Sequence, residues 1–350
     1  MKLRFIIVIG VTFFSSALPL ILMMFRMSGP IKNIGFGHFA YFGTETPFTL
    51  PLSRESVTLT DGTYMYHLNH SQFEYEFPYL QRYQCSFILT PWTESKKDIH
   101  SMLILAIKSH PQSGSRREVL RRTWAREEEF DGYIIRPIFL IGQTDVSGQM
   151  EIVKKESQEF GDILQWDIYE EHHNLSLKEF CFLDYLYHQI PEVTFIFKGD
   201  DDVYVNPSGI IQYIIKHGSS PQTLHGALQR HSVVMRTSKY QISKAIFPNN
   251  KYPYFLSGGG FIYPGATVKV LYEKSKKIPV FPLDDVYFGF LALAANLTYR
   301  HDKRFHVFGL KYDACNYQRA LVVHNIDPNQ LQKMWLEIKS TTCKDINTDR

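Results

Sequence analysis

Continuous apolar runs alternate with amphipathic segments through the middle of the chain. The apolar runs cover residues 101–108, 133–144 and 193–198, and each has the composition of a strand that is buried on both faces. Helices are expected over residues 115–130, 147–160 and 174–190. This order of strands and helices predicts an α/β fold with a largely parallel sheet. In such folds ligands bind at the carboxyl ends of the strands.

Two local features refine these elements. Pro137 lies inside the second apolar run, and proline predicts a break or an edge position in a sheet because it has no N–H to donate. In the third helix, Ser176 and Glu179 have the spacing of a capping box, in which each side chain bonds a free backbone N–H.

The amino terminus carries a membrane-length apolar segment. Residues 5–25 form a run of 21 residues without a charge, about the length that spans a bilayer core. A cleaved signal peptide usually has a shorter apolar stretch and a small-residue cleavage site, so a retained anchor is the favoured alternative. The predicted organisation is a cytosolic tail (1–4), a transmembrane signal-anchor (5–25), a stem (26–63) and a folded lumenal domain (64–350).

Sequons and cysteines agree with a secretory location. N-x-S/T sequons begin at Asn69, Asn174 and Asn296, and beside an anchor they suggest that the bulk of the chain lies in the secretory lumen. Disulfides are permitted there, and Cys315 with Cys343 is a plausible pair, with buried free thiols as the alternative. The chain has 4 cysteines and no CxxC pair, so a zinc site is not expected.

Composition narrows the class of protein. Among 350 residues, 44% are hydrophobic and 21% are charged, which excludes a disordered or collagen-like chain. The formal net charge is only +3, so the chain has no electrostatic footprint for nucleic acid.

An acidic cluster follows the third apolar run directly. Asp200, Asp201 and Asp202 repel one another unless a cation or solvent relieves them. In an extended segment Asp200 and Asp202 point to the same side, and carboxylate oxygens suit Mg²⁺ or Mn²⁺. A helix cap or a solvated loop is the alternative use of such residues. The position at the end of a buried strand favours a metal site that could bridge nucleotide phosphates.

A glycine run and a second acidic pair lie further along the chain. Gly258, Gly259 and Gly260 allow close backbone approach to a ligand, although a tight turn or a strand kink would use them as well. Asp284 and Asp285 precede an apolar segment that is expected to be a buried helix. Carboxylates are stabilised at a helix N-terminus, but one of the two could instead be a general base.

Five motifs stand in a fixed order along the chain, and together they resemble one enzyme family. They span residues 116–124, 198–206, 257–263, 282–289 and 321–325. From about Ile99 to Cys343 the sequence resembles the β1,3-glycosyltransferases, which include β1,3-galactosyltransferases and β1,3-N-acetylglucosaminyltransferases. The resemblance implies a GT-A fold, a Rossmann-like sheet flanked by helices, and a type II protein of the Golgi membrane. It also implies inverting transfer from a UDP-sugar donor to a glycan acceptor, with Mn²⁺.

The resemblance also implies roles for individual residues. Asp200, Asp202 and His324 match the metal ligands, and Asp285 matches the catalytic base, with Asp284 adjacent. The donor-binding positions are matched by Arg117, Arg121, Asp200, Asp201, Gly258, Gly259 and Gly260.

The motifs do not all indicate the same donor sugar. Gly199-Asp-Asp-Asp202 and Leu283-Asp-Asp-Val286 resemble the N-acetylglucosaminyl branch, whereas the Trp124-Ala125 ending of the first motif departs from the usual Trp-Gly. The segment from Tyr252 to Leu256 also departs from the usual double-proline form. We therefore expect transfer of GlcNAc from UDP-GlcNAc to a β-galactose-terminated acceptor. The alternatives are a galactosyltransferase that uses UDP-Gal, or a non-catalytic member that binds glycans or acts as a chaperone.

Overall fold

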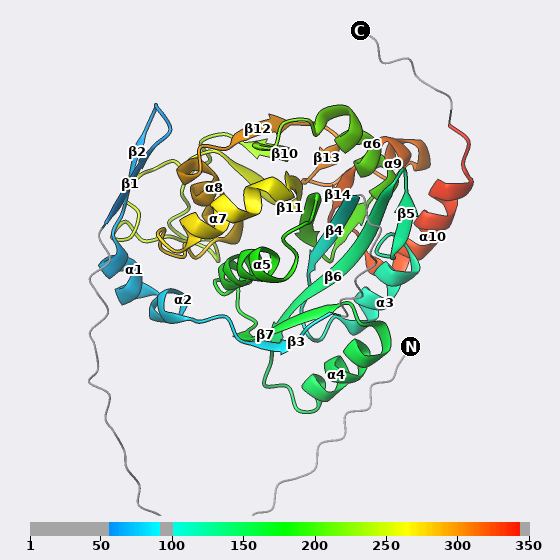
Figure 1. The fold of residues 1–350 in the computed structure, drawn as a ribbon, viewed down its shortest axis with the longest axis horizontal. Helices are drawn as coiled ribbons and strands as arrows, with labels where there is room; N and C mark the ends of the chain where they lie inside the picture. Colours follow the sequence, from blue (N-terminus) through cyan, green and yellow to red (C-terminus); the bar gives the residue numbers. More distant parts are fainter. Residues whose placement is uncertain (1–55, 92–100, 344–350) are drawn as a thin grey trace, which may run out of the picture. The chain divides into compact units, whose positions relative to one another are not determined.

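A mixed sheet is the central feature of the computed structural model, which describes residues 56–91 and 101–343 (Figure 1). Its strands are β3 (Phe87–Leu89), β4 (Ser101–Lys108), β5 (Glu128–Phe130), β6 (Tyr133–Gln143), β7 (Ile163–Tyr169), β8 (Phe195–Asp200), β10 (Thr223–Gln229), β11 (Phe255–Pro264) and β12 (Thr298–His301). The spatial order is β12-β10-β11-β8-β4-β6-β7-β3, with β5 paired to β6 beside this path. Strands β8, β4 and β6 are parallel, as predicted, and β7, which was not predicted from the sequence, continues the parallel part of the sheet. Because β11, β3 and β5 join antiparallel, the whole sheet is mixed rather than largely parallel.

Helices cover both faces of this sheet. They are α3 (Gly114–Arg122), α4 (Gln149–Phe160), α5 (Leu175–Gln189), α6 (Pro207–His217), α7 (Val268–Ser275), α8 (Asp284–Ala294), α9 (Ala314–Arg319) and α10 (Pro328–Ser340), with the short 3₁₀ helix Gly265–Thr267 before α7. Successive side chains of a strand point to opposite faces. Accordingly Leu103 and Leu105 of β4 pack in the cluster that contains α3, α6 and α10, whereas Ile104 and Ala106 pack in the cluster that contains α5, α7 and α8. The central α/β fold is thus confirmed.

Two small sheets complete the fold. One pairs β13 (Phe305–His306), β14 (Val322–His324) and β9 (Val203–Val205). The other pairs β1 (Val57–Thr60) with β2 (Met65–Leu68), and it is followed by helices α1 (His70–Glu76) and α2 (Pro78–Arg82). Strand β1 lies within the range that was predicted to be stem, so the ordered domain begins earlier than residue 64. The aromatic segment after it packs against the body, as Tyr66 and Phe73 have no exposed surface.

The first predicted helix is shorter than its sequence suggests. Helix α3 ends at Arg122, because Thr123 leaves the helical conformation with φ −119° and ψ −102°. This turn carries Trp124 into the core, where its side chain is 1% exposed and its indole N–H donates to the carbonyl of Val203 at 3.0 Å. Residues Glu128–Phe130, which were predicted to be helical, form strand β5 instead.

Pro137 does not interrupt its strand. Strand β6 is continuous from Tyr133 to Gln143 and is central in the sheet. On the side away from β4, strand β5 pairs only as far as Ile135, and the pairing with β7 starts at Phe139. Pro137 lies in the interval between these two partners, where a missing N–H costs no ladder bond.

The predicted capping box of α5 is not formed. The N-cap residue of α5 is Asn174, whose side chain makes no capping hydrogen bond. Glu179 instead forms a fully buried ion pair with Lys198 of β8. The need to neutralise a buried lysine outweighs the small gain of a helix cap.

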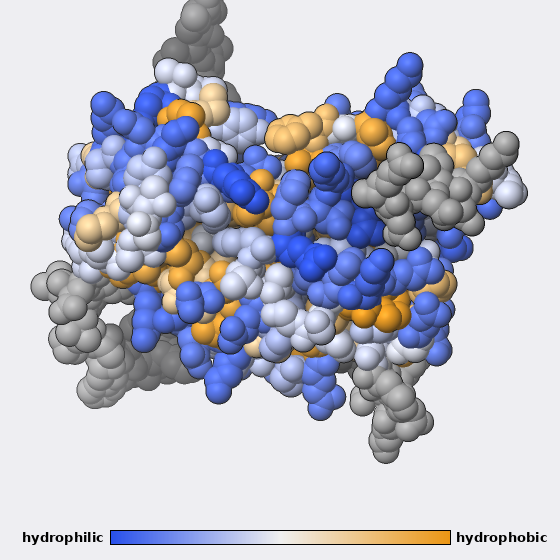
Figure 2. Space-filling model, turned by 90° about the horizontal axis from the view of Figure 1, so that it is seen from above, coloured by the Kyte–Doolittle hydropathy of each residue, from blue (hydrophilic) through white to orange (hydrophobic). Residues whose placement is uncertain are grey.

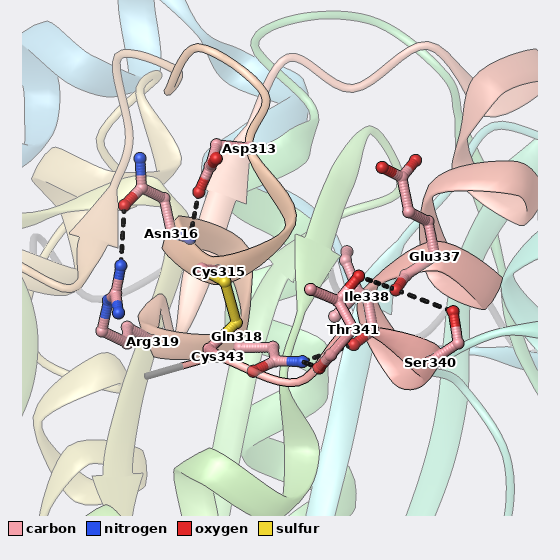
Figure 3. Close-up of a disulfide and its surroundings, with 10 residues drawn as sticks. All are labelled: Asp313, Cys315, Asn316, Gln318, Arg319, Glu337, Ile338, Ser340, Thr341 and Cys343. Atoms are coloured by element: carbon pink, nitrogen blue, oxygen red, sulfur yellow. Dashed lines mark hydrogen bonds between the residues drawn. A yellow bond between two sulfur atoms is a disulfide. The ribbon is translucent and has the colours of Figure 1, made fainter. Parts of the chain in front are cut away.

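Two disulfides link distant parts of the described chain. Cys315 bonds Cys343, as predicted, and joins α9 to the segment that follows α10 (Figure 3). In the same corner the Gln318 side-chain amide donates to the carbonyls of Ile338 and Thr341, each at 2.6 Å. The second pair, Cys85 with Cys181, was not predicted, and it joins the segment before β3 to α5.

The surface and the interior differ strongly in polarity. The face shown in Figure 2 is mainly hydrophilic, with apolar side chains in small separate groups.

Among residues 56–91 and 101–343, no helix is long and apolar enough to cross a membrane. The anchor predicted over residues 5–25 lies outside the described residues.

Candidate active site

A pocket of about 730 Å³ lies where the ends of several central strands meet. The end of β4 brings Lys108 to it, and the end of β8 brings Asp200. Strand β11 contributes Gly258, the first turn of α8 contributes Asp285, and β14 contributes His324. The motifs that the sequence separates by more than 200 residues thus converge at the carboxyl edge of the parallel strands, as the fold predicts.

The three predicted metal ligands are close enough to share one ion. A ligand atom from each of Asp200, Asp202 and His324 lies within 4.8 Å of the others. His324 reaches this position because β14 pairs antiparallel with β9, so that His324 stands opposite Val203, the residue after Asp202. Gly259 also permits the approach, since a Cβ at that position would lie only 3.3 Å from the imidazole.

The chemistry of these three groups fits a divalent cation. The Oδ1 of Asp202 is buried, and among the described residues it has no hydrogen-bond partner. The Nε2 of His324 lies 3.3 Å from this oxygen, and the contact raises the pKa of His324 and lowers that of Asp202 although burial acts in the other direction on both. Two carboxylates with one imidazole suit Mn²⁺ better than a thiophilic metal.

Asp201, the middle residue of the acidic cluster, is bound by protein groups instead. Its Oδ1 accepts from Arg116 at 3.0 Å, and its Oδ2 accepts from the hydroxyl of Ser109 at 2.7 Å. Burial nevertheless raises its pKa. The side chain lines the pocket, but both of its carboxylate oxygens already accept hydrogen bonds from protein groups.

The two carboxylates at the start of α8 have opposite environments. Asp284 bonds the ammonium of Lys108 at 2.5 Å and lies 3.9 Å from that of Lys198, and these cations lower its pKa although burial opposes them. For Asp285, burial and the neighbouring charge of Asp284 raise the pKa to about 7. Its Oδ1 accepts from the backbone N–H of Val286 at 2.8 Å. A carboxylate with a pKa near neutrality is suited to general-base chemistry, so the geometry distinguishes Asp285 from Asp284.

Lys108 connects the two acidic clusters, and sequence reasoning missed it. Its side chain is 6% exposed, and its ammonium lies 2.9 Å from Asp200 and 2.5 Å from Asp284. These carboxylates raise its pKa well above the usual value, although burial acts in the other direction. The available signal was a charged residue at the end of an otherwise apolar strand.

The glycine run is a regular part of β11 rather than a turn. A Cβ at Gly258 would lie 3.5 Å from Asp285 and 3.7 Å from the ammonium of Lys108. A Cβ at Gly260 would come within 2.9 Å of Val322. The absence of side chains at Gly259 and Gly260 therefore lets β11 pack closely against β14, whereas a Cβ at Gly258 would make only ordinary contacts.

Comparison with known proteins agrees with this arrangement. The model of the family described as galactosyltransferase matches residues 115–303. The chain belongs to the galactosyltransferase family. The matched range includes both acidic clusters and the glycine run, while Lys108 and His324 lie outside it.

Several curated relatives of the family carry more specific names. The human acetylgalactosaminyl-O-glycosyl-glycoprotein β-1,3-N-acetylglucosaminyltransferase is 33% identical over 254 residues, covering 68% of this chain and 66% of that protein. The rat UDP-GlcNAc:βGal β-1,3-N-acetylglucosaminyltransferase 7 is 32% identical, covering 69% and 65% respectively. The human N-acetyllactosaminide β-1,3-N-acetylglucosaminyltransferase 3 is 31% identical, covering 69% of each chain. The first two alignments span just under two thirds of those relatives.

The two arginines predicted to bind the donor lie outside the pocket. The side chain of Arg117 has no exposed surface and binds Glu156 of α4 at 2.6 Å. Arg121 binds Asp162 at 2.7 Å and Glu156 at 2.8 Å. Successive helical residues are rotated by about 100°, so only one of the neighbouring arginines of α3 can face the pocket. That residue is Arg116, which lines the pocket and is 31% exposed.

The sequons differ in accessibility. Asn69 and Asn296 are exposed, and both remain predicted glycosylation sites. Asn174 is only 7% exposed, and its side-chain amide donates to the carbonyl of Tyr169 at 3.0 Å. A glycan on that nitrogen would remove this hydrogen bond, so Asn174 is the least accessible of the three predicted glycosylation sites.

Proposed function

We propose that this chain is an inverting β1,3-N-acetylglucosaminyltransferase with a GT-A fold. It transfers GlcNAc from UDP-GlcNAc to the 3-hydroxyl of a β-galactose-terminated glycan. The observation that carries the proposal is the presence, in one pocket, of three side chains that could hold a cation and a half-buried carboxylate whose pKa is raised to about 7. The names of the relatives support the choice of donor.

The bond changes follow from the two halves of the pocket. The oxygen of the acceptor hydroxyl forms a bond to the anomeric carbon, while the bond from that carbon to the diphosphate oxygen breaks. Asp285 takes the proton from the attacking hydroxyl, because its raised pKa makes it a stronger base than an ordinary aspartate. Since attack and departure are on opposite sides, the configuration of the anomeric carbon inverts, and UDP leaves.

The departing diphosphate needs positive charge. Asp200, Asp202 and His324 would hold Mn²⁺, which when bound neutralises charge on the diphosphate. Arg116 lies in the same pocket and takes the role that we had expected of Arg117 and Arg121. Its bond to Asp201 fixes the guanidinium beside the acidic cluster.

Lys108 controls the charge of the carboxylate beside the proposed base. By binding Asp284, it holds that carboxylate in its charged form next to Asp285. The negative charge of Asp284 raises the pKa of the base, whereas the positive charge of Lys108 lowers it, so the two charges act on Asp285 in opposite directions. We therefore expect Lys108 to act as a positioning residue for both acidic clusters.

A second candidate is a β1,3-galactosyltransferase that uses UDP-Gal. The description of the matched family favours it, and the pocket residues named above would perform the same chemistry on either donor. The donor experiment below separates the two candidates.

The cellular location is part of the proposal. We expect residues 5–25 to anchor the chain in the Golgi membrane as a single-pass type II protein with a lumenal catalytic domain. Two disulfides and the exposed sequons at Asn69 and Asn296 support an oxidising, glycosylating compartment.

The test is UDP release by the purified full-length chain in detergent, with Mn²⁺ and a β-galactoside acceptor. UDP-GlcNAc and UDP-Gal are compared, and EDTA and the Asp202→Ala variant are the controls. We expect release from UDP-GlcNAc that both controls abolish. Preference for UDP-Gal would move the protein to the galactosyl branch. A folded chain that binds UDP with Mn²⁺ but turns over neither donor would contradict the proposed activity.

A further inference from the structure

Tyr252 is a buried tyrosine whose hydroxyl lacks a partner. The residue is 4% exposed, and among the residues described by the structure its hydroxyl finds no hydrogen-bond partner. The ring is held on several sides by Phe247, Phe255 and Phe281, with centroid separations of 5.5, 6.3 and 5.9 Å. Leaving a buried hydroxyl unsatisfied is costly, so such a group calls for an explanation.

The position of this hydroxyl connects it with the proposed base. Tyr252 and Asp285 both line the pocket. Burial raises the pKa of Tyr252, while Arg236 lowers it and the charge of Asp285 raises it further. The phenol stays protonated at neutral pH, and it can donate one hydrogen bond and accept others.

His172 supplies a second polar atom of the same kind. It lines the same pocket, and its Nε2 is buried without a hydrogen-bond partner in the described parts of the chain. Burial, with the nearby His173 and Lys239, lowers the pKa of His172, so the imidazole is neutral at pH 7. A neutral imidazole has one N–H and one lone pair, which are the groups that a sugar hydroxyl recognises.

Apolar side chains border these two polar atoms. Val233, Met235 and Tyr240 line the pocket from the β10–β11 connection and are 62%, 46% and 42% exposed. The ring of Tyr240 packs edge-on against His172, with centroids 5.1 Å apart. The connection is fixed by Arg236, whose guanidinium donates to several backbone carbonyls of the same loop. An aromatic and aliphatic wall with a few polar groups matches the mixed faces of a hexose.

We propose that Tyr252 and His172 bind hydroxyl groups of the acceptor sugar and thereby present its reacting hydroxyl to Asp285. The inference rests on the proposed function, and it adds the acceptor subsite to it. Tyr252 acts through a single hydrogen bond from a rigid ring. His172 closes the other side of the sugar, and the wall of Val233, Met235 and Tyr240 contacts the apolar face.

The experiment compares Tyr252→Phe with a matched control, Tyr185→Phe. Tyr185 is 2% exposed, and its hydroxyl also has no hydrogen-bond partner among the described residues, but it does not line the pocket. Steady-state kinetics are measured with the full-length chain on a β-galactoside and on its monodeoxy analogues. The affinity for UDP with Mn²⁺ and the melting temperature are measured in parallel.

We expect Tyr252→Phe to raise the acceptor KM about 3- to 15-fold, as for the loss of one neutral hydrogen bond, with the affinity for UDP unchanged. For one deoxy analogue, the acceptor KM of Tyr252→Phe should be close to its KM for the parent acceptor, because the hydroxyl that this analogue lacks is the one that Tyr252 binds. His172→Gln should show the same pattern with a different analogue. Tyr185→Phe should keep the wild-type acceptor KM.

Two results would overturn the inference, and they have different meanings. In the first, the wild-type chain transfers sugar, but Tyr252→Phe has the wild-type acceptor KM and shows the same rise in KM as wild type for every deoxy analogue. The proposed subsite is then wrong, and the transferase activity stands. If the wild-type chain transfers to no acceptor while binding UDP with Mn²⁺, the proposed function fails and the acceptor subsite fails with it.

Discussion

Two clusters of charged side chains lie on different sides of helix α3, and they differ in how completely the protein satisfies them. In the cluster between α3 and α4, Arg117 and Arg121 bind Glu156 and Asp162 through several short contacts. The pKa of Glu156 is lowered by these arginines although burial opposes them. Each charge in this cluster has a fixed partner of opposite sign.

The pocket on the other side keeps charges that the protein does not fully satisfy. Asp202 has a buried oxygen without a hydrogen-bond partner among the described residues, and Asp285 has a pKa of about 7 because its charge is not compensated. Removing one partner from a fully paired buried cluster destabilises the fold, whereas charges that are left incompletely paired can bind a ligand or move a proton. The arginine-rich helix motif contributes to both clusters, through Arg117 and through Arg116 respectively.

The largest expected effect is the loss of the base. Asp285→Asn keeps the shape of the side chain but cannot accept the proton, so turnover should fall by ~10²–10⁴. Because Asp285 is not among the metal ligands, the affinity for UDP with Mn²⁺ should stay close to wild type. Stopped-time UDP release and calorimetric titration measure the two quantities. Lost UDP binding in a folded variant would place Asp285 on the donor instead.

Paired substitutions of neighbouring arginines test the comparison directly. Arg117→Met leaves Glu156 with less compensation in a buried site, and it should lower the free energy of unfolding by about 3–5 kcal/mol. Arg116→Met removes a partly exposed side chain, and it should reduce turnover with a much smaller loss of stability. Urea unfolding and UDP release are measured on both variants. If Arg117→Met weakens UDP binding while its free energy of unfolding stays at the wild-type value, the distinction between the structural cluster and the pocket is wrong.

Removal of a metal ligand should act on the pocket alone. Asp202→Ala should weaken binding of UDP with Mn²⁺ by more than ~10–100-fold, which is the usual cost of losing even an outer-shell partner. Asp162→Asn is the matched control from the structural cluster, and it should lower the melting temperature while the Mn²⁺-dependent affinity for UDP is kept. Equal losses of affinity in the two variants would refute the distinction.

The smallest effect is on the pH profile. A base with a pKa of about 7 loses its proton acceptor function as the pH falls, so kcat/KM should drop about tenfold per pH unit below 7 and level off above it. Asp284→Asn removes the charge that helps to raise this pKa and frees the ammonium of Lys108 beside it. In this variant the fall of kcat/KM on the acidic side of the pH profile should therefore occur at lower pH than in wild type. An unchanged acidic side would show that another group controls the profile.

Local sequence patterns were sufficient for the buried strands and the acidic clusters. Strands β4, β6 and β8 stand where continuous apolar runs predicted them, and α8 begins at the Asp284–Asp285 pair. The spacing of Asp200 and Asp202 after a buried strand pointed to a metal site. These features depend on neighbours within a few residues, so the sequence contains their cause.

Other features depended on partners far away in the sequence. The sequence around Arg117 does not indicate that its partner is Glu156 on α4. The end of α3 was set by the burial of Trp124 against β9. Cys85 and Cys181 are 96 residues apart, and no local signal pairs them. Lys108 was passed over because its two carboxylate partners come from β8 and α8.

The sequence by itself determined the α/β class, the family, and the residue types available for metal and proton chemistry. The tertiary structure decided which of those residues meet, and in which state of charge. Asp284 and Asp285 are identical and adjacent, yet Lys108 lowers the pKa of the first, while burial and that first charge raise the pKa of the second. The physical reason is that burial and Coulomb interactions depend on distances in space, which the order of residues along the chain does not give.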